Sequence, residues 1–407
     1  MNSSYWRLWT ATVVSRLGDS VRQPALGLLA AALTRDPVAF AVVAIAGQLP
    51  WLLVGLFAGA LADRWDRRRT MAAVDGLRML LVLAFAGLVL ADRVTIAALA
   101  GFAFLLTALG TLFDAAATAV LPAIVPAARL PTANGRMAVG ITVIGGFVGT
   151  PLGAVLYAVA AALPFAVDAV TFAVAALLAL TLPSARPPAA DRPGLFAEAR
   201  LGLRWLAAHP TLRALTGLTA GANLVVGALL AVLVLLALEH LHVPARGFGL
   251  FFAVASLGAA LGGLLAGRVG RLLGTLPALA VVLVAQTAAL VALAVLRAPA
   301  PGAVALGLFT AGGALWNVLV MSYSQGEVPS GLLGRVGTAQ RMAGVASAPV
   351  GAALGGALAA WLGLTGLLLC CAAAMALVAV ATVVLAGRSR RAEFRPRPVL
   401  PAGTTGR

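Results

Sequence analysis

Long apolar runs, separated by short polar connections, follow one another along the whole chain. A helix needs about 20 apolar residues to cross the hydrocarbon core of a bilayer. The runs are unbroken, which excludes the alternating ten-residue strands of a porin-type barrel. We therefore expect twelve transmembrane helices, at residues 8–34, 38–62, 71–91, 95–120, 137–161, 164–182, 212–238, 247–267, 275–296, 302–325, 339–362 and 364–387.

The longest connection lies between the sixth and seventh spans and divides the chain into two sets of six. Its sequence "GLFAEARLGLRWLAAHP" alternates leucines with charged residues, a pattern that predicts an amphipathic helix on the inner membrane surface. The expected organisation is an N-terminal bundle (1–182), a cytoplasmic linker (183–211), a C-terminal bundle (212–387) and a basic cytoplasmic tail (388–407).

The two halves repeat short sequences at nearly one offset. "GALADRWDR" at 59–67 matches "GLLAGRVGR" at 263–271, and "RMA" at 136–138 recurs at 341–343. Such duplicated halves are a common plan of secondary transporters, which bind substrate between the halves near the bilayer midplane. The expected fold is an all-α membrane protein of twelve transmembrane helices in two pseudo-repeated six-helix bundles.

Composition and charge support a membrane location. Hydrophobic residues make up 62% of the chain and charged residues only 10%, against about 25% in ordinary soluble domains. The net charge of +16 comes entirely from arginine, and 22 arginines fall on one side of the expected spans against 4 on the other. By the positive-inside rule both termini are cytoplasmic, in a multi-pass cell-membrane protein. The basic charge then reflects topology, and no nucleic-acid partner is expected.

Nothing in the sequence indicates an enzyme. The two cysteines are adjacent and cannot build a disulfide framework, the three histidines form no metal motif, and no ATP-binding Gly-Lys-Ser/Thr loop occurs. We expect no catalytic residues, no resident metal and no cofactor.

The connection between spans two and three reads "GALADRWDRRR" at 59–69. It resembles the loop signature of the major facilitator superfamily, Gly-x-Leu-x-Asp-Arg-x-Gly-Arg-Arg. The matching residues are Gly59, Leu61, Asp63, Arg64, Arg67 and Arg68, while Asp66 stands at the position of the family's second glycine.

This resemblance implies a role for the loop as a cytoplasmic latch between the halves. Asp63 would contact a helix N-terminus of the other half, an arrangement that the helix dipole favours. In the second copy of the repeat Gly267 replaces the aspartate, and Gly270 restores the family glycine. The alternative is a loop that serves topology alone.

Span five contains "GGFVGTPLGA" at 145–154. Its Gly145, Gly149, Pro151 and Gly153 are similar to a motif of family exporters, with Thr150 as an extra residue. Small residues also simply allow close helix packing, which is the alternative interpretation. Together with the opening "LWTATVVSRLGDSVRQPAL", the chain looks most like the bacterial drug, macrolide and siderophore exporters.

Charged residues within the expected spans are costly in lipid and indicate a partner or a function. Arg16, Asp19 and Arg22 follow at three-residue steps and can neutralise one another, as can Asp75 and Arg78. These pairs could serve helix packing alone.

Asp114 and Asp168 have no basic residue within a turn of their own helix. A carboxylate without a partner in a low-dielectric environment binds a proton more readily than one in water. Asp114, then Asp168 and Asp19, are the proton-coupling candidates, with interhelical hydrogen bonding as the alternative role. Many proton-coupled relatives carry an arginine in span four, and residues 95–120 contain none.

The preferred function is proton-coupled efflux of amphipathic or lipophilic small molecules by alternating access, in a monomer embedded in lipid. The alternatives are an importer of a small solute and a transport-silent sensor or assembly protein. Besides Asp19, the cavity candidates are Arg22, Asn223, Trp316, Asn317 and Tyr323.

Overall fold

The computed structural model describes residues 2–54, 65–126, 129–183, 195–244, 247–329 and 332–393, and these are helical apart from short connections. The N-terminal half contains α1 (Ser3–Leu33), α2 (Pro37–Leu53), α4 (Arg67–Leu90), α5 (Ile96–Ile124), α6 (Leu130–Thr142), η2 (Val143–Gly149), α7 (Thr150–Val159) and α8 (Leu163–Leu180). After α9 (Leu195–Ala208) come α10 (Pro210–Leu235), η3 (Leu236–His240), α11 (Phe248–Leu273), α12 (Thr275–Val295), α13 (Pro299–Glu327) and α14 (Leu333–Glu393).

Nine helices of the described chain are long and apolar enough to cross a membrane. The α14 stretch among them makes two crossings, because Gly363 breaks it with φ 71° at the boundary expected from the sequence. The charged α1 and the 17-residue described part of α2 complete the twelve expected crossings. The predicted all-α membrane fold is confirmed.

Side chains at helix starts explain several boundaries. Asn2, Asp36, Asp66 and Thr95 each accept a hydrogen bond from a backbone N–H of the first turn, which satisfies a donor that the helix leaves open. The Asp66 carboxylate accepts from the Arg69 N–H at 3.2 Å. The aspartate at the family's glycine position is therefore the N-cap of α4.

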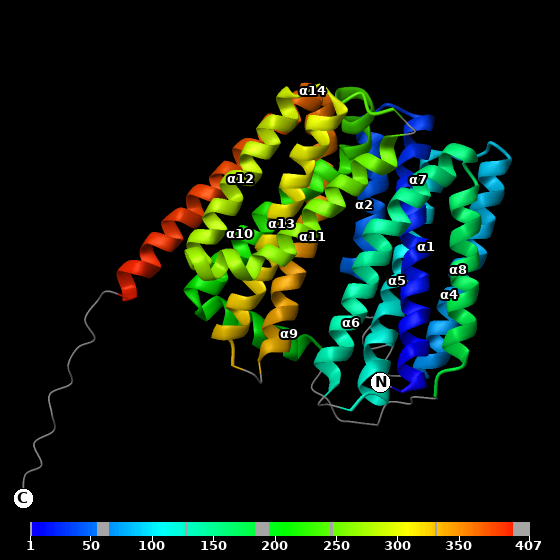
Figure 1. Cartoon of the computed structure of the whole chain (residues 1–407), viewed down its shortest axis with the longest axis horizontal. Coiled ribbons are helices and arrows are strands. Elements are labelled where there is room, and N and C mark those ends of the chain that lie inside the picture. Colours follow the sequence, from blue (N-terminus) through cyan, green and yellow to red (C-terminus); the bar gives the residue numbers. More distant parts are fainter. Residues whose placement is uncertain are drawn as a thin grey trace, which may run out of the picture.

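One pair of helices, α5 and α13, shares length and register across the two halves. α5 and α13 both have 29 residues, and both ends of α13 lie 203 positions after those of α5. Figure 1 shows α10 to α14 gathered on one side and α1, α4, α5 and α8 on the other. The bounds of this pair thus repeat within two positions of the offsets, 204 and 205, at which the short sequences recur.

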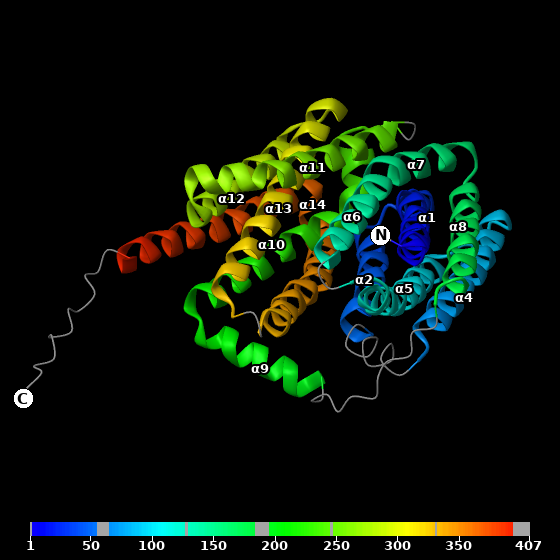
Figure 2. The same cartoon turned by 60° about the horizontal axis from the view of Figure 1, so that its bottom comes forward.

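The predicted amphipathic segment forms α9, which crosses beneath the C-terminal half (Figure 2). Its Leu206 is buried against Leu212, Val328 and Val336. The final helix continues to Glu393, beyond the expected end of the last span at Gly387. The start of the basic tail is therefore helical.

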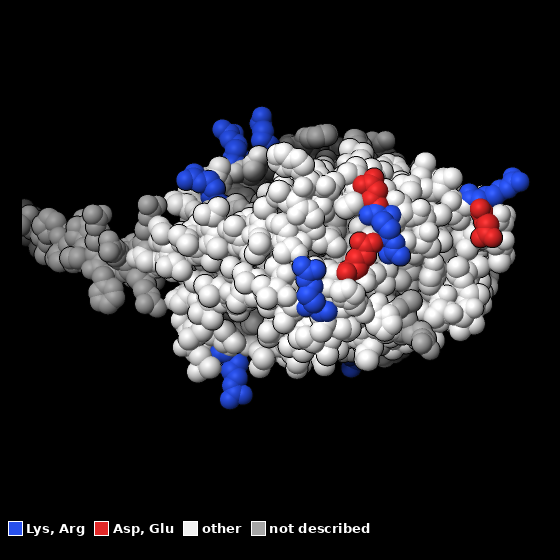
Figure 3. Space-filling model, turned by 90° about the horizontal axis from the view of Figure 1, so that it is seen from above, with Lys and Arg blue, Asp and Glu red and all other residues white. Residues whose placement is uncertain are grey.

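The two halves touch at the end of the helices opposite the N-terminus, here called the outer end. There a Cβ on Gly27 of α1 would lie 2.6 Å from Val234 of α10, and one on Gly356 would lie 2.3 Å from Ala41. Arg35 and Glu239 form an ion pair of 3.5 Å across the same junction. Seen from this end, the surface carries few charged side chains (Figure 3).

At the opposite, inner end the described hydrophobic cores remain separate. One core there contains residues of the N-terminal half alone, around Tyr5 and Phe113, and another contains C-terminal residues around Leu206. The largest core instead joins Leu28, Ala41 and Ala154 to the C-terminal half near the outer end. The described hydrophobic cores therefore join the two halves at the outer end and stay separate at the inner end.

Candidate functional site

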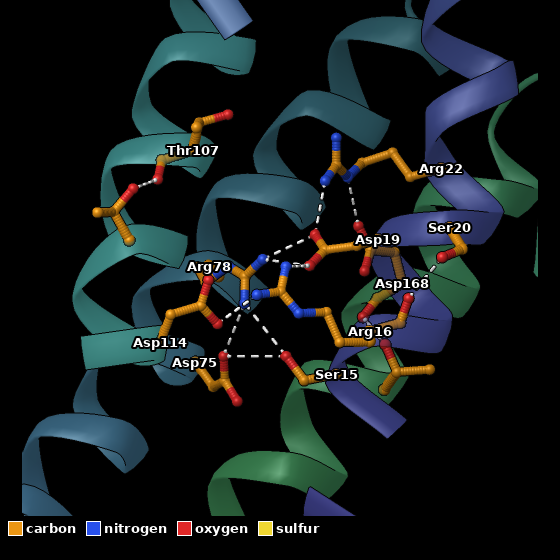
Figure 4. Close-up of polar contacts among 12 residues, drawn as sticks. Ser15, Arg16, Asp19, Ser20, Arg22, Asp75, Arg78, Thr107, Asp114 and Asp168 are labelled. Carbon is orange, nitrogen blue, oxygen red and sulfur yellow. Dashed lines mark hydrogen bonds and ion pairs between the residues drawn. The ribbon is translucent and has the colours of Figure 1, made fainter. Parts of the chain in front are cut away.

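Seven charged side chains from four helices of the N-terminal half meet between the helices (Figure 4). Three are arginines and four are aspartates, and their contacts connect α1, α4, α5 and α8. We call this group the charge cluster; it consists of Arg16, Asp19, Arg22, Asp75, Arg78, Asp114 and Asp168.

Asp19 lies at the centre of the charge cluster. Its Oδ1 accepts from Nη2 of Arg22 and from Nη2 of Arg78, both at 2.7 Å, while Arg16 lies at 3.6 Å. The ion pairs expected along α1 are confirmed, and Arg78 of α4 is added to them. Three cations therefore surround one carboxylate, which ties α1 to α4.

Asp168 is not isolated in the folded chain, although its own helix offers no partner. The Arg22 Nε donates to its Oδ2 at 2.7 Å, and its side chain is fully buried. Gly18 makes this approach possible, because a Cβ there would lie 2.3 Å from Asp168 Oδ1 and 1.9 Å from the Thr171 hydroxyl.

Arg78 is enclosed by polar and aromatic groups. Its Nη1 donates to Asp75 at 3.1 Å and to the Ser15 hydroxyl at 3.2 Å, which confirms the pair expected on α4. Its guanidinium lies 4.0 Å from the centroid of the Phe172 ring, a cation–π contact. Both terminal nitrogens of this buried arginine thus have partners, while its Nε has no hydrogen-bond partner among the described residues.

Two carboxylate oxygens remain without a hydrogen bond from the described residues: Oδ2 of Asp75 and Oδ1 of Asp168. Both side chains are fully buried. A buried polar atom without a donor is unfavourable, and protonation of a carboxylate reduces that cost.

Asp114 of α5 pairs with Arg16 of α1. Like Asp168, it has no basic partner on its own helix but meets an arginine of another helix. The side chains of Asp114 and Arg16 are 24% and 28% exposed, more than any other pair in the charge cluster. Gln23, seven residues after Arg16 on the same helix face, is also exposed. A polar stripe of α1 thus faces open space.

The C-terminal cavity candidates have varied surroundings. The Trp316 indole N–H donates to the Thr219 hydroxyl at 3.0 Å and the ring is buried, so it packs α13 against α10. Asn317 is exposed, while Asn223 and Tyr323 are half-buried. None of these four side chains lies in the charge cluster.

Most of the loop motif, Gly59, Leu61, Asp63 and Arg64, lies outside the described residues. Its last arginines begin α4. Arg67 donates to the Ala119 carbonyl at 2.9 Å, and Arg68 donates to the Leu182 carbonyl at 3.3 Å. Cations near the carboxyl ends of helices also favour the helix dipole. These two arginines therefore fasten the start of α4 to the ends of α5 and α8.

The glycines of the span-five motif pack against α1. A Cβ would lie 2.9 Å from Ser20 at Gly145, 2.5 Å from Ser20 at Gly149 and 1.9 Å from the Val21 carbonyl at Gly153. Pro151 lies instead against Gly249 of α11, in the other half. The motif therefore places α1 and α11 on either side of one helix.

The extra Thr150 of this motif follows a π-helical turn, η2. A π turn holds one more residue than an α turn, and the Thr150 hydroxyl donates to the Gly145 carbonyl at 3.3 Å. The π turn thus accommodates Thr150, the extra residue of the motif, within the helix.

Sequence reasoning missed three residues that contact the charge cluster, Ser15, Gly18 and Phe172, and the exposed Gln23 beside it on α1. Gln23 carried a signal, since it shares a face with Arg16. Gly18 and Phe172 carried none, because the chain has 45 glycines and many apolar aromatics.

Comparison with solved structures places the fold among transporters. The chain resembles the nucleoside transporter NupG (TM-score 0.73, 14% identity, covering 97% of this chain and 100% of that one). It resembles a bacterial homologue of the iron transporter ferroportin in its inward-facing state (TM-score 0.74, 16% identity, 95% and 100% covered). At these identities the likeness shows the fold alone.

Curated relatives match a shorter region. Uncharacterized MFS-type transporters of Mycobacterium tuberculosis and Mycobacterium bovis are each 32% identical over 150 residues. The match covers 36% of this chain and a third of the length of each relative.

The family described as transmembrane secretion effector matches residues 1–401, nearly the whole chain. This agrees with the twelve crossings, the repeated halves and the loop motif. The chain therefore belongs to the transmembrane secretion effector family of major facilitator transporters.

Proposed function

We propose that this protein is a secondary active transporter that exports amphipathic or lipophilic small molecules in exchange for protons. The charge cluster is the observation that carries the proposal. A purely structural ion-pair network would balance its charges, whereas this one joins four carboxylates to three guanidiniums.

The odd carboxylate gives the charge cluster a place for one proton. With every group ionised the cluster has a net charge of −1, which is unfavourable inside a membrane protein. One proton would make it neutral. Since the four helices share the cluster, gain or loss of that proton would change the attraction between them.

Asp114 is the proposed proton-binding residue because it combines access with a single partner. Its side chain is 24% exposed and pairs with Arg16, whereas Asp168 is fully buried behind Arg22. When Asp114 is protonated, Arg16 can move toward Asp19, which lies 3.6 Å away. The tie between α1 and α5 would then weaken and the halves could rearrange.

One observation supports export: the matched family is described as a secretion effector. The described hydrophobic cores of the two halves are separate at the end that carries the N-terminus and α9, and the excess of arginines in the sequence predicts a cytoplasmic location for that end. Substrate would enter from the cytoplasm or inner leaflet, and protons entering from outside would supply the work.

Transport in inverted vesicles with an imposed pH gradient tests this proposal. Asp114→Asn should lose uphill transport. Asp92→Asn, in the outer connection after α4, is the matched control and should behave as the wild type. Uphill transport at the wild-type level in Asp114→Asn would overturn the assignment.

A further inference from the structure

An apolar pocket of about 240 Å³ lies in the outer half of the C-terminal helices α10, α11 and α13. Its walls include Leu229, Leu230, Phe252, Ala259 and Phe309. The Thr310 hydroxyl donates to the Ala255 carbonyl at 2.6 Å and to its own helix, so the pocket gains little polarity from it.

Close packing fixes the wall between α11 and α13. A Cβ on Gly258 would lie 2.1 Å from the Gly307 carbonyl oxygen, and one on Gly262 would lie 2.1 Å from that of Ala311. The two helices therefore touch backbone to backbone. Backbone contact between α11 and α13 thus holds this wall of the pocket in place.

The α10 wall of the pocket lies on the helix face that meets the N-terminal half. Val234 of α10 touches Gly27 of α1, and Leu230, one turn further in, is 53% exposed. On the opposite side Gln23 lies one turn inward of Gly27 and is also exposed. The space between the halves thus begins just below this contact, with Leu230 on one side and Gln23 on the other.

The two sides of this space differ in chemistry. The α1 side presents Gln23 and the partly exposed Arg16–Asp114 pair, at the edge of a charge cluster with one excess carboxylate. The other side presents the apolar pocket. A molecule that satisfies both has an apolar group at one end and a single positive charge at the other.

We propose that the α10–α11–α13 pocket binds the apolar group of a transported amphipathic monocation, whose charged end lies against the charge cluster. This inference rests on the proposed transport function. The bound cation neutralises the excess carboxylate as a proton does, so cation and proton exclude each other.

Binding to the purified protein in lipid nanodiscs tests the inference without transport. The probes are hexyltrimethylammonium, tetramethylammonium and hexanesulfonate, measured by titration calorimetry. Burial of the hexyl chain should make the first probe bind at least about tenfold more tightly than either of the others. Absence of that preference, or of any binding, overturns the proposed substrate class.

Ala259→Phe fills the pocket, and Leu261→Phe adds an aromatic ring on the exposed side of the same helix as its control. Only Ala259→Phe should weaken hexyltrimethylammonium binding, by about tenfold. If both variants bind hexyltrimethylammonium with equal affinity, the pocket assignment is overturned. That result is expected if a lipid chain fills the pocket. If the wild-type protein binds hexyltrimethylammonium but shows no pH-driven transport, the proposed proton coupling is contradicted instead.

Discussion

At offsets of 204 and 203 along the internal repeat, Asp19 of α1 corresponds to Asn223 of α10, and Asp114 of α5 corresponds to Asn317 of α13. The carboxylates of the N-terminal half thus have amides as counterparts. The C-terminal stretches 214–238, 275–295 and 299–326 contain no charged residue. One half gathers charges between its helices, and the other has none in these three stretches.

The C-terminal half relies on neutral contacts instead. Gln340 donates to the hydroxyls of Thr216 and Ser324, and Gln286 donates to the Phe309 carbonyl at 3.0 Å. Such bonds do not change with a proton gradient, whereas the charge cluster can. We infer that the N-terminal half responds to protons while the C-terminal half supplies a constant frame and an apolar surface.

The largest effect on stability should follow from removing Arg78, which connects α4 to α1 and α8. Arg78→Leu removes the cation paired with Asp75 and one of the three cations around Asp19, and loss of one member of a buried pair costs about 3–5 kcal/mol. The variant should unfold far below the wild-type temperature in detergent. Arg93→Leu, in an outer connection, is the control; equal stability of the two would contradict the role of Arg78.

Glycine substitutions compare helix packing in the two halves. Gly18→Ala would press on Asp168 and Thr171, and such overpacking costs about 1–3 kcal/mol. Gly217→Ala in α10 meets nothing within 4 Å, so better helix propensity should stabilise it slightly. The melting temperatures of both variants test this comparison. A Gly18→Ala variant as stable as the wild type would contradict the close contact between α1 and α8.

A charge placed in the neutral half should be tolerated poorly. Asn223→Asp puts a half-buried carboxylate among stretches of α10, α12 and α13 (214–235, 275–295 and 299–326) that carry no cation. Its melting temperature should fall at pH 8 and recover toward that of the wild type at pH 5, because protonation removes the charge. A drop that is independent of pH would show that packing, not charge, distinguishes the halves.

The smallest effect is expected for a neutral hydrogen bond. Trp316→Phe removes the bond to Thr219, worth about 0.5–1.5 kcal/mol, and leaves the charge cluster untouched. Thr219→Val and the double variant complete a thermodynamic cycle. Stability should fall slightly, and the dependence of transport on the pH gradient should stay at the wild-type level.

The sequence predicted the crossings well because the length of an apolar run and the breaks between runs are local properties. Gly363 illustrates this, since its position between two runs was enough to locate the break. The ion pairs within α1 and within α4 were predictable for the same reason, as three-residue spacing fixes a shared helix face.

The contacts between helices were not predictable. Arg16 and Asp114 are 98 positions apart, and their pairing depends on how α1 and α5 are rotated against each other. Spacing along one helix made Asp114 and Asp168 look isolated, yet each meets an arginine of α1. Asp66 likewise became interpretable only when its bond to Arg69 identified it as a helix cap.

The most direct test of the central claim counts protons. Purified protein in weakly buffered solution is mixed with saturating hexyltrimethylammonium, and the pH change is recorded. We expect release of up to one proton per bound cation in the wild type and none in Asp114→Asn, because the charge cluster holds a single excess carboxylate. Equal proton release from both proteins, or none from the wild type at any pH, would contradict the account.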